Sequence, residues 1–175
     1  MGYRSDVAAA FYAVDVKDFP VINFRVDAVK GQSLMFLKRR KEVKINEVFD
    51  YYIKAEEVIG IMGSHIVFNY TKNIIQVLSV EAGALSQESG RIVNPNPILQ
   101  TIDSINGRVS VDMLINAGTP RKGLWGSGGM VKIQMRALST GTADIIFKSD
   151  SIIVRDTTNK IISLSQLING KVVVK

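Results

Sequence analysis

Residues 60–83 read GIMGSHIVFNYTKNIIQVLSVEAG, and this stretch carries the clearest structural signal in the chain. Apolar and polar residues alternate over Ser64–Tyr70 and again over Ile74–Val80, which predicts two half-buried β-strands. The polar residues between them predict a turn, and Gly83 predicts a second turn. Residues 126–147, GSGGMVKIQMRALSTGTADIIF, repeat this organisation later in the chain. Such segments are typical of a module that binds a partner or builds an assembly rather than one that catalyses.

The same two-residue period runs through most of the chain after Lys30. It predicts further short strands at Ser33–Leu37, Glu42–Ile45, Val48–Ala55, Leu99–Ile102, Arg108–Leu114, Met130–Ala137, Ala143–Phe147, Ser151–Val154, Ile161–Ile162 and Lys171–Val174. Turn-forming residues separate these strands, and Gly126–Gly129 is predicted as one such turn. Helix is expected only as about one turn each at Gln87–Val93 and Leu164–Ile168. Many short strands at this spacing predict an all-β sandwich or jelly roll of about nine strands.

The first 30 residues differ from the rest of the chain. Ser5 or Asp6 can cap a short helix whose apolar residues, Phe11 among them, recur at the helical period. Val21–Val26 then alternates, with Phe24 on its apolar side, which predicts a strand. We therefore expect a helix-and-strand arm at residues 1–30, followed by the sandwich at residues 31–175.

The composition of the chain excludes several classes of function. A chain of 175 residues with a mass of 19.3 kDa fits one domain with an appendage. The absence of cysteine excludes disulfides and thiolate chemistry, and a single histidine leaves little material for metal or general-base chemistry. The net charge of +6 is spread along the chain, and no apolar run is long enough to cross a membrane. We expect no enzyme activity, no cofactor, no bound metal and no specific nucleic acid partner.

A family resemblance emerges from the two long segments. Residues 43–85 resemble the first half of a cohesin domain, a β-sandwich module of cellulosomal scaffoldins and of other bacterial and archaeal surface proteins. Residues 106–147 resemble its second half. The matching positions are Gly63, Ile66, Phe68, Tyr70, Ile75, Val77, Val80 and Gly83, then Gly126, Gly128, Val131, Ile133, Met135, Ala137, Gly141 and Ile145. The resemblance covers about residues 31–175 and implies a cohesin-like jelly-roll β-sandwich.

Two departures from the family pattern concern its partner. Thr71 and Lys72 follow Tyr70 where the common pattern has Asp-Pro. His65 stands on the strand that lies on the dockerin-binding face of cellulosomal cohesins, at a position that is often acidic there. An imidazole cannot act as an acceptor-only group as a carboxylate does. The resemblance therefore implies the scaffold and counts against the usual dockerin contact.

Three candidate contact residues follow from the alternation. His65, Val67 and Asn69 are expected to point outward, because Ile66 and Phe68 take the inner face of the same strand. His65 is interpreted either as a contact on an interaction face or as an exposed residue without a role. Val67 is interpreted either as part of an apolar interface patch or as a residue covered by a neighbouring loop.

The remaining candidates lie elsewhere in the sequence. Trp125, the only tryptophan, is predicted to anchor a partner, to stack on a sugar or to pack over the end of the sandwich. The cluster Lys38–Lys41 is interpreted as an anion-binding site or as a solvated edge that discourages edge pairing. Phe11 and Phe24 are candidate attachment residues in the arm.

The function expected from the sequence is that of a non-catalytic structural or protein-interaction module. Cohesin-like modules usually act outside the cell, yet the chain as given has no recognisable signal peptide. The leading hypothesis is therefore a virion component, displayed on a capsid or tail lattice and anchored by the arm. The alternatives are an extracellular or cell-surface cohesin-type module that binds a dockerin-like partner, and a carbohydrate-binding β-sandwich. A homo-oligomer is compatible with each.

Overall fold

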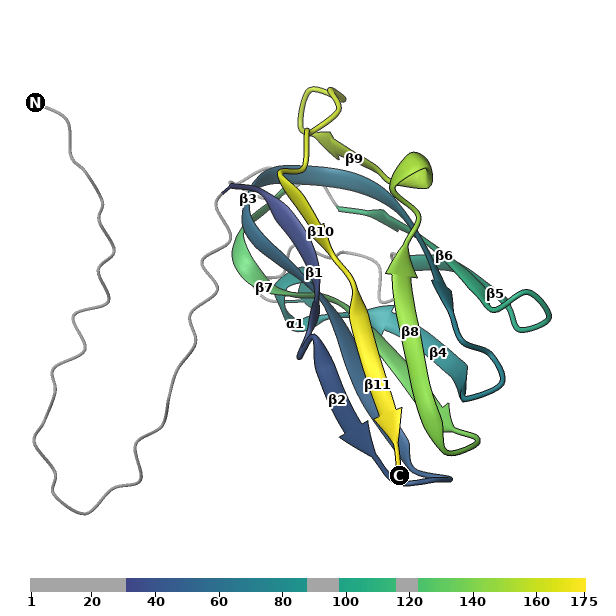
Figure 1. Cartoon of the computed structure of the whole chain (residues 1–175). Coiled ribbons are helices and arrows are strands. Elements are labelled where there is room, and N and C mark those ends of the chain that lie inside the picture. Colours follow the sequence, from purple (N-terminus) through teal and green to yellow (C-terminus); the bar gives the residue numbers. More distant parts are fainter. Residues whose placement is uncertain (1–30, 88–97, 116–122) are drawn as a thin grey trace, which may run out of the picture.

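The computed structural model describes residues 31–87, 98–115 and 123–175, and these residues form the predicted all-β sandwich (Figure 1). The predicted arm at residues 1–30, with Phe11 and Phe24, lies outside the described residues. So does most of the helical turn expected at Gln87–Val93. The described part contains one short helix, α1 (Ala84–Gln87), and one 3₁₀ turn, η2 (Ser149–Ser151).

Two layers of strands share the long strand β3 (Val48–Tyr70). The first layer contains, side by side, β10 (Gln166–Ile168), β1 (Ser33–Leu37), the first half of β3, β7 (Leu124–Ala137) and β4 (Ile75–Ala82). The second layer contains β5 (Ile98–Asp103), β6 (Arg108–Leu114), the second half of β3, then β9 (Ile153–Asp156) and β8 (Gly141–Phe147), and finally β11 (Gly170–Val174) and β2 (Arg40–Val43). All pairs are antiparallel except β1 with β10 and β11 with β2.

Strand β3 corrects the prediction of separate strands at Val48–Ala55 and Ser64–Tyr70, because the chain remains extended between them. Its register slips against β7 after Ala55, and Glu57 and Gly60 have positive φ angles of 50° and 70°. A bulge of this kind bends a strand without ending it. The Ser127 hydroxyl accepts the Glu57 N–H at 3.0 Å, which helps to hold a non-glycine residue in this conformation. β3 can therefore leave one layer and enter the other.

Two further predictions were wrong. Gly126–Gly129 is not a turn but lies within β7, where it pairs with the bent part of β3. Gly128 leaves room there for the side chain of Leu85, because a Cβ on Gly128 would lie only 3.0 Å from the Leu85 Cβ. The predicted helical turn at Leu164–Ile168 is instead strand β10.

The number of strands also exceeds the prediction of about nine. Eleven strands are described, and two runs of the chain each supply two of them in different layers. β1 and β2 follow one another but lie in different layers, and so do β10 and β11. These two crossings bring the β1–β2 turn beside β11, at one edge of the second layer (Figure 1).

The core between the layers centres on an aromatic cluster. The Phe36 ring stacks on Tyr51 and on Phe147, at centroid distances of 5.5 and 4.5 Å, and meets Phe68 edge-on. The Tyr51 hydroxyl donates to the Lys38 carbonyl at 2.7 Å. Tyr51 is only 1% exposed, and burial raises the pKa of its hydroxyl to about 12. The cluster thus joins the core to the β1–β2 turn.

Candidate functional site

One outer face of the sandwich gathers the sequence-predicted contact strand and its neighbours. We call it the His65 face; it comprises the outward residues of β5, β6, the second half of β3, β8 and β9. Paired residues on adjacent strands share a face. The register therefore places Leu99, Asp112, His65 and Ile153 in one row across four strands. A second row contains Asp103, Arg108, Asn69 and Ile146.

His65 and Asp112 form the polar centre of this face. His65 Nδ1 lies 2.6 Å from Asp112 Oδ1, and the two side chains are 38% and 49% exposed. An ionised carboxylate only accepts hydrogen bonds, so the imidazole donates from Nδ1. This contact orients the ring and leaves Nε2 for another partner. The outward orientation predicted for His65 is confirmed.

Apolar side chains surround this polar centre. Leu99 and Leu114 are 76% and 72% exposed, and Ile146 and Ile153 are 46% and 40% exposed. Leu114 stands opposite Gly63, which has no side chain to cover it. Leu99, Leu114 and Ile153 lie in or next to the row of His65, whereas Ile146 lies beside Asn69, four residues further along β3. Exposed apolar side chains gathered on one face are typical of interaction sites.

The outer face of the first layer has a different character. Lys132 on β7 pairs with Asp50 at 3.4 Å and with Glu81 at 3.8 Å, and Lys54 pairs with Glu56 at 2.5 Å. The carboxylate of Asp50 raises the pKa of Lys132. This face also exposes apolar side chains, but among the described residues Val48 there is 44% exposed, less than Leu99 and Leu114 on the His65 face.

Val67 and Asn69 differ in solvent exposure on the His65 face. Asn69 is exposed, as predicted. Val67 also lies at an outward position but is 0% exposed. The Lys148 N–H donates to its carbonyl at 2.9 Å, and the following 3₁₀ turn, η2, packs against β3. Coverage by a neighbouring segment is therefore the correct interpretation, and Val67 offers no surface to a partner.

Trp125 does not join this face. It pairs with Ile59 where β7 meets the bent part of β3, and the two side chains are 43% and 54% exposed. His65 lies beyond the bend, on the part of β3 that pairs with β6 and β9. Trp125 thus lies apart from the His65 face, and the three interpretations of it, as a partner anchor, as a sugar-stacking residue and as a residue packed over the end of the sandwich, stay predictions.

The residues that depart from the family pattern have structural contacts. The Thr71 hydroxyl accepts the Asp144 N–H at 3.1 Å, and the Thr71 N–H donates to the Asp144 carbonyl at 3.2 Å. The Lys72 ammonium donates to the carbonyl of Ile105 in the β5–β6 turn. Thr71 and Lys72 therefore tie the β3–β4 turn to two neighbouring segments.

The residues of the basic cluster Lys38–Lys41 have different surroundings in the structure. Lys41 turns back along the sheet, where its ammonium donates to the Asp50 carbonyl at 2.8 Å and lies 5.1 Å from the centre of the Phe49 ring. Burial lowers the pKa of this ammonium. Arg39 and Arg40 instead line a surface hollow together with Lys171. The cluster is therefore partly structural and partly available at the surface.

Sequence reasoning missed Asp112 and the exposed leucines. The alternation of Arg108–Leu114 places Asp112 outward, but only the strand pairing shows that it meets His65. Ser64, adjacent to His65, is buried on the opposite side of β3, so His65 cannot activate its hydroxyl. Within the described ranges, no group of three or more His, Cys, Asp or Glu residues is placed to hold a metal ion. None of the helices found there is long and apolar enough to span a membrane.

Comparisons with known proteins agree with this architecture. The chain superimposes on the cohesin of a Clostridium thermocellum OlpA cohesin–dockerin complex with a TM-score of 0.69 and 17% identity, covering 82% of this chain and 99% of that one. The third ScaC cohesin of Acetivibrio cellulolyticus, solved with a ScaB dockerin, gives a TM-score of 0.68, 18% identity and coverages of 82% and 99%. A non-cellulosomal cohesin of the archaeon Archaeoglobus fulgidus superimposes with a TM-score of 0.63 and 14% identity, covering 82% of this chain and 91% of that one.

At the sequence level, no curated protein matches the chain. A family model, however, matches residues 35–174, and its description is "Cohesin domain". The chain therefore belongs to the cohesin domain family.

Proposed function

We propose that this protein is a non-catalytic protein-binding module of the cohesin type, and that its His65 face takes a dockerin-like partner. The observation that carries the proposal is the contrast between the two outer faces. Both outer faces carry ion pairs, but they differ in apolar exposure: Val48 on the first layer is 44% exposed, whereas Leu99 and Leu114 on the His65 face are 76% and 72% exposed. Two of the solved cohesins described above were captured with dockerins, which supports the same class of partner.

The dimensions of the His65 face suit a helical surface. Strands in a sheet lie about 4.8 Å apart, so the row from Leu99 to Ile153 spans roughly 14 Å. A helix with its side chains is about 10 Å wide. A helix that lies along the row rises about 1.5 Å per residue, so roughly ten residues cover it, and its polar residues can reach His65 and Asp112.

The His65–Asp112 pair provides a carboxylate near position 65, where this chain has histidine and the family pattern often has an acidic residue. The resemblance predicts an acceptor where His65 stands, and an imidazole does not replace it. Asp112 supplies a carboxylate on the adjacent strand, 2.6 Å from the ring. The pair thus offers an acceptor on Asp112 and a second group on His65 Nε2, so this face recognises a partner with a different polar pattern from that of the usual family.

The other hypotheses depend on different parts of the chain. Virion attachment rests on residues 1–30, which lie outside the described residues, and it stays a prediction. A location outside the cell is part of the dockerin-type proposal. Sugar binding rests on Trp125, which lies away from the His65 face.

A dockerin panel tests the proposal. The chain is immobilised, and purified dockerins, including those encoded in the source genome, are passed over it as wild type and as Leu114→Asp. Burial of a leucine contributes about 1.5–3 kcal/mol, so we expect at least about tenfold weaker binding by the variant. Val48→Asp is the matched control, because Val48 is 44% exposed on the opposite layer. The proposal is wrong if no dockerin binds, or if both substitutions have the same effect.

A further inference from the structure

Two exposed apolar side chains meet at the bend of β3, apart from the His65 face. Ile59 on β3 and Trp125 on β7 are paired in the strand register and therefore share one side of the sheet. Their side chains are 54% and 43% exposed, and we call these two residues the bend patch. A Cβ on Gly126 would have no described atom within 4 Å beyond its two chain neighbours. An extended segment can therefore lie close to the backbone beside Trp125.

The chain that precedes β1 is directed toward the bend patch. β1 runs antiparallel to β3, with Ser33 opposite Glu56. The residues before Ser33 therefore proceed toward the part of β3 that follows Glu56. A hydrogen bond shows that the described chain reaches the patch, because Gln32 Oε1 accepts the Ile59 N–H at 3.0 Å.

The first described residues are held firmly at this place. The Gly31 N–H donates to Glu57 Oε2 at 3.1 Å, and the Ser165 N–H donates to the Gln32 carbonyl at 2.7 Å. Gly31 has a φ angle of 82°, and a Cβ on it would lie 2.4 Å from the Ser165 Oγ. Glycine permits both this conformation and this close approach. The preceding part of the chain therefore starts from a defined point beside Ile59.

The sequence just before this point contains matching apolar residues. Val21–Val26 is the predicted strand of the arm, with Ile22, Phe24 and Val26 on one side. Val26 and Gln32 are six positions apart in the chain. Six residues span at most about 20 Å when fully extended, which is enough for Val21–Val26 to turn back onto a patch that Gln32 itself contacts. A segment attached so close to its site has an effective concentration on the order of millimolar there.

We propose that Val21–Val26 of the same chain docks on the bend patch and covers Ile59 and Trp125 with the side chains of Ile22, Phe24 and Val26. Attachment favours this occupant over the same segment of a second copy, which is present only at the concentration of the protein. The inference goes beyond the dockerin-type function, because it concerns a different surface. The arm then controls access to Trp125, since a partner that binds the arm uncovers the tryptophan.

The fluorescence of Trp125, the only tryptophan, tests this inference in the full chain. Phe24→Asp places a charge on the docking side of Val21–Val26, and Phe24→Ala repeats the comparison without a new charge. Phe11→Asp is the matched control, because it makes the same change in the arm outside that segment. Wild type should emit at short wavelength and resist quenching by acrylamide. Both Phe24 variants should emit at longer wavelength and be quenched as a side chain 43% exposed, whereas Phe11→Asp should match the wild type.

The outcomes of this comparison are distinct. Equal fluorescence of the wild type and both Phe24 variants overturns the inference. An equal red shift in Phe11→Asp also overturns it, because the effect would then not belong to Val21–Val26. A dilution series identifies the chain that supplies the arm: emission that is independent of concentration supports the chain's own arm, whereas a red shift of the wild type on dilution assigns the cover to a second copy and overturns the proposal. None of these readouts depends on Leu114, so they are independent of the test of dockerin binding.

Discussion

The buried hydroxyl of Tyr51 predicts a pH-dependent reversal of stability between the wild type and Tyr51→Phe. At neutral pH the wild type should be more stable by about 1 kcal/mol, because the variant lacks the hydrogen bond from Tyr51 to the Lys38 carbonyl. The phenylalanine ring keeps the stacking on Phe36, so the packing of the core changes little.

At alkaline pH the difference in stability between the two proteins has the opposite sign. The unfolded chain releases the Tyr51 proton at the ordinary pKa of 10.0, whereas the folded chain holds it up to about 12. Between these pH values the folded state binds more protons than the unfolded state, so stability falls as the pH rises. The difference of two pKa units corresponds to about 3 kcal/mol, which exceeds the hydrogen bond. Tyr51→Phe should therefore be the more stable protein near pH 12, with a crossover near pH 11.

Urea unfolding at a series of pH values measures this reversal. Trp125, the only tryptophan, supplies the fluorescence signal, and tyrosinate absorbance reports the ionisation itself. The difference in free energy of unfolding between the two proteins cancels other groups that titrate in this range, such as Lys41. A difference that stays constant from about pH 9 to about pH 12 would refute the argument, since the folded state would then not hold the Tyr51 proton.

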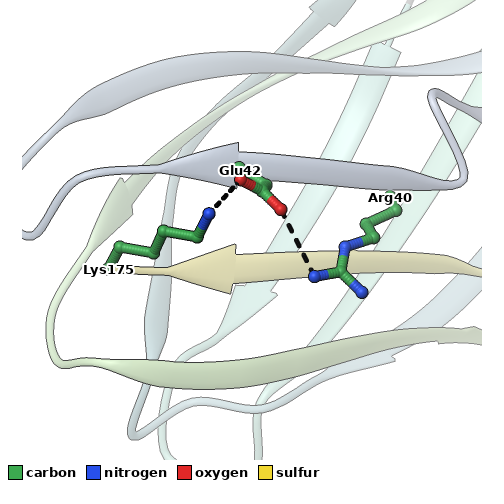
Figure 2. A network of polar contacts seen from close by, with 3 residues as sticks. All are labelled: Arg40, Glu42 and Lys175. Carbon is green, nitrogen blue, oxygen red and sulfur yellow. Dashed lines mark hydrogen bonds and ion pairs between the residues drawn. The ribbon is translucent and has the colours of Figure 1, made fainter.

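Two further predictions concern glycines and surface charge. Gly83→Ala should cost about 3 kcal/mol or more in unfolding free energy, because its Cβ would lie 2.3 Å from the Gly129 carbonyl oxygen, which is backbone and cannot move aside. Gly63→Ala is the matched control, because its Cβ meets nothing closer than 3.7 Å; equal losses in the two proteins would contradict this account. Glu42→Gln should destabilise the protein at neutral pH, because it removes the charge that the Lys175 ammonium contacts (Figure 2), and the difference should vanish as the pH falls through the lowered pKa of Glu42. Urea unfolding against pH checks this, and a difference that persists in acid would exclude the Lys175 contact as its cause.

Strand positions were predictable where one residue in two is buried. Ser33–Leu37 and Arg108–Leu114 match the predicted bounds, because alternation alone defines a strand with one face on the core. The prediction failed where glycine is used for close packing. Gly126–Gly129 has the composition of a turn, yet it lies in β7, where Gly128 leaves the space that the Leu85 side chain needs. That need is invisible until the neighbours are known.

The candidate site was predictable only in part for the same reason. The alternation along one strand pointed His65 and Asn69 outward, and the structure agrees. It gave the same orientation to Val67, which a segment about 80 residues later in the chain covers. It could not pair His65 with Asp112, because the register between β3 and β6 depends on both strands and on the residues around them.

The sequence by itself therefore determined the all-β class, the positions of most strands, the inward and outward sides of the contact strand, and the cohesin resemblance. These properties are local, since each depends on a residue period or a short motif. The tertiary structure alone decided which outward residues become a surface. It placed Leu99, Asp112, His65 and Ile153 in one row, covered Val67, and brought Arg39 beside Lys171. Such contacts join residues that are far apart in the chain, and only the pairing of strands across the two layers brings them together.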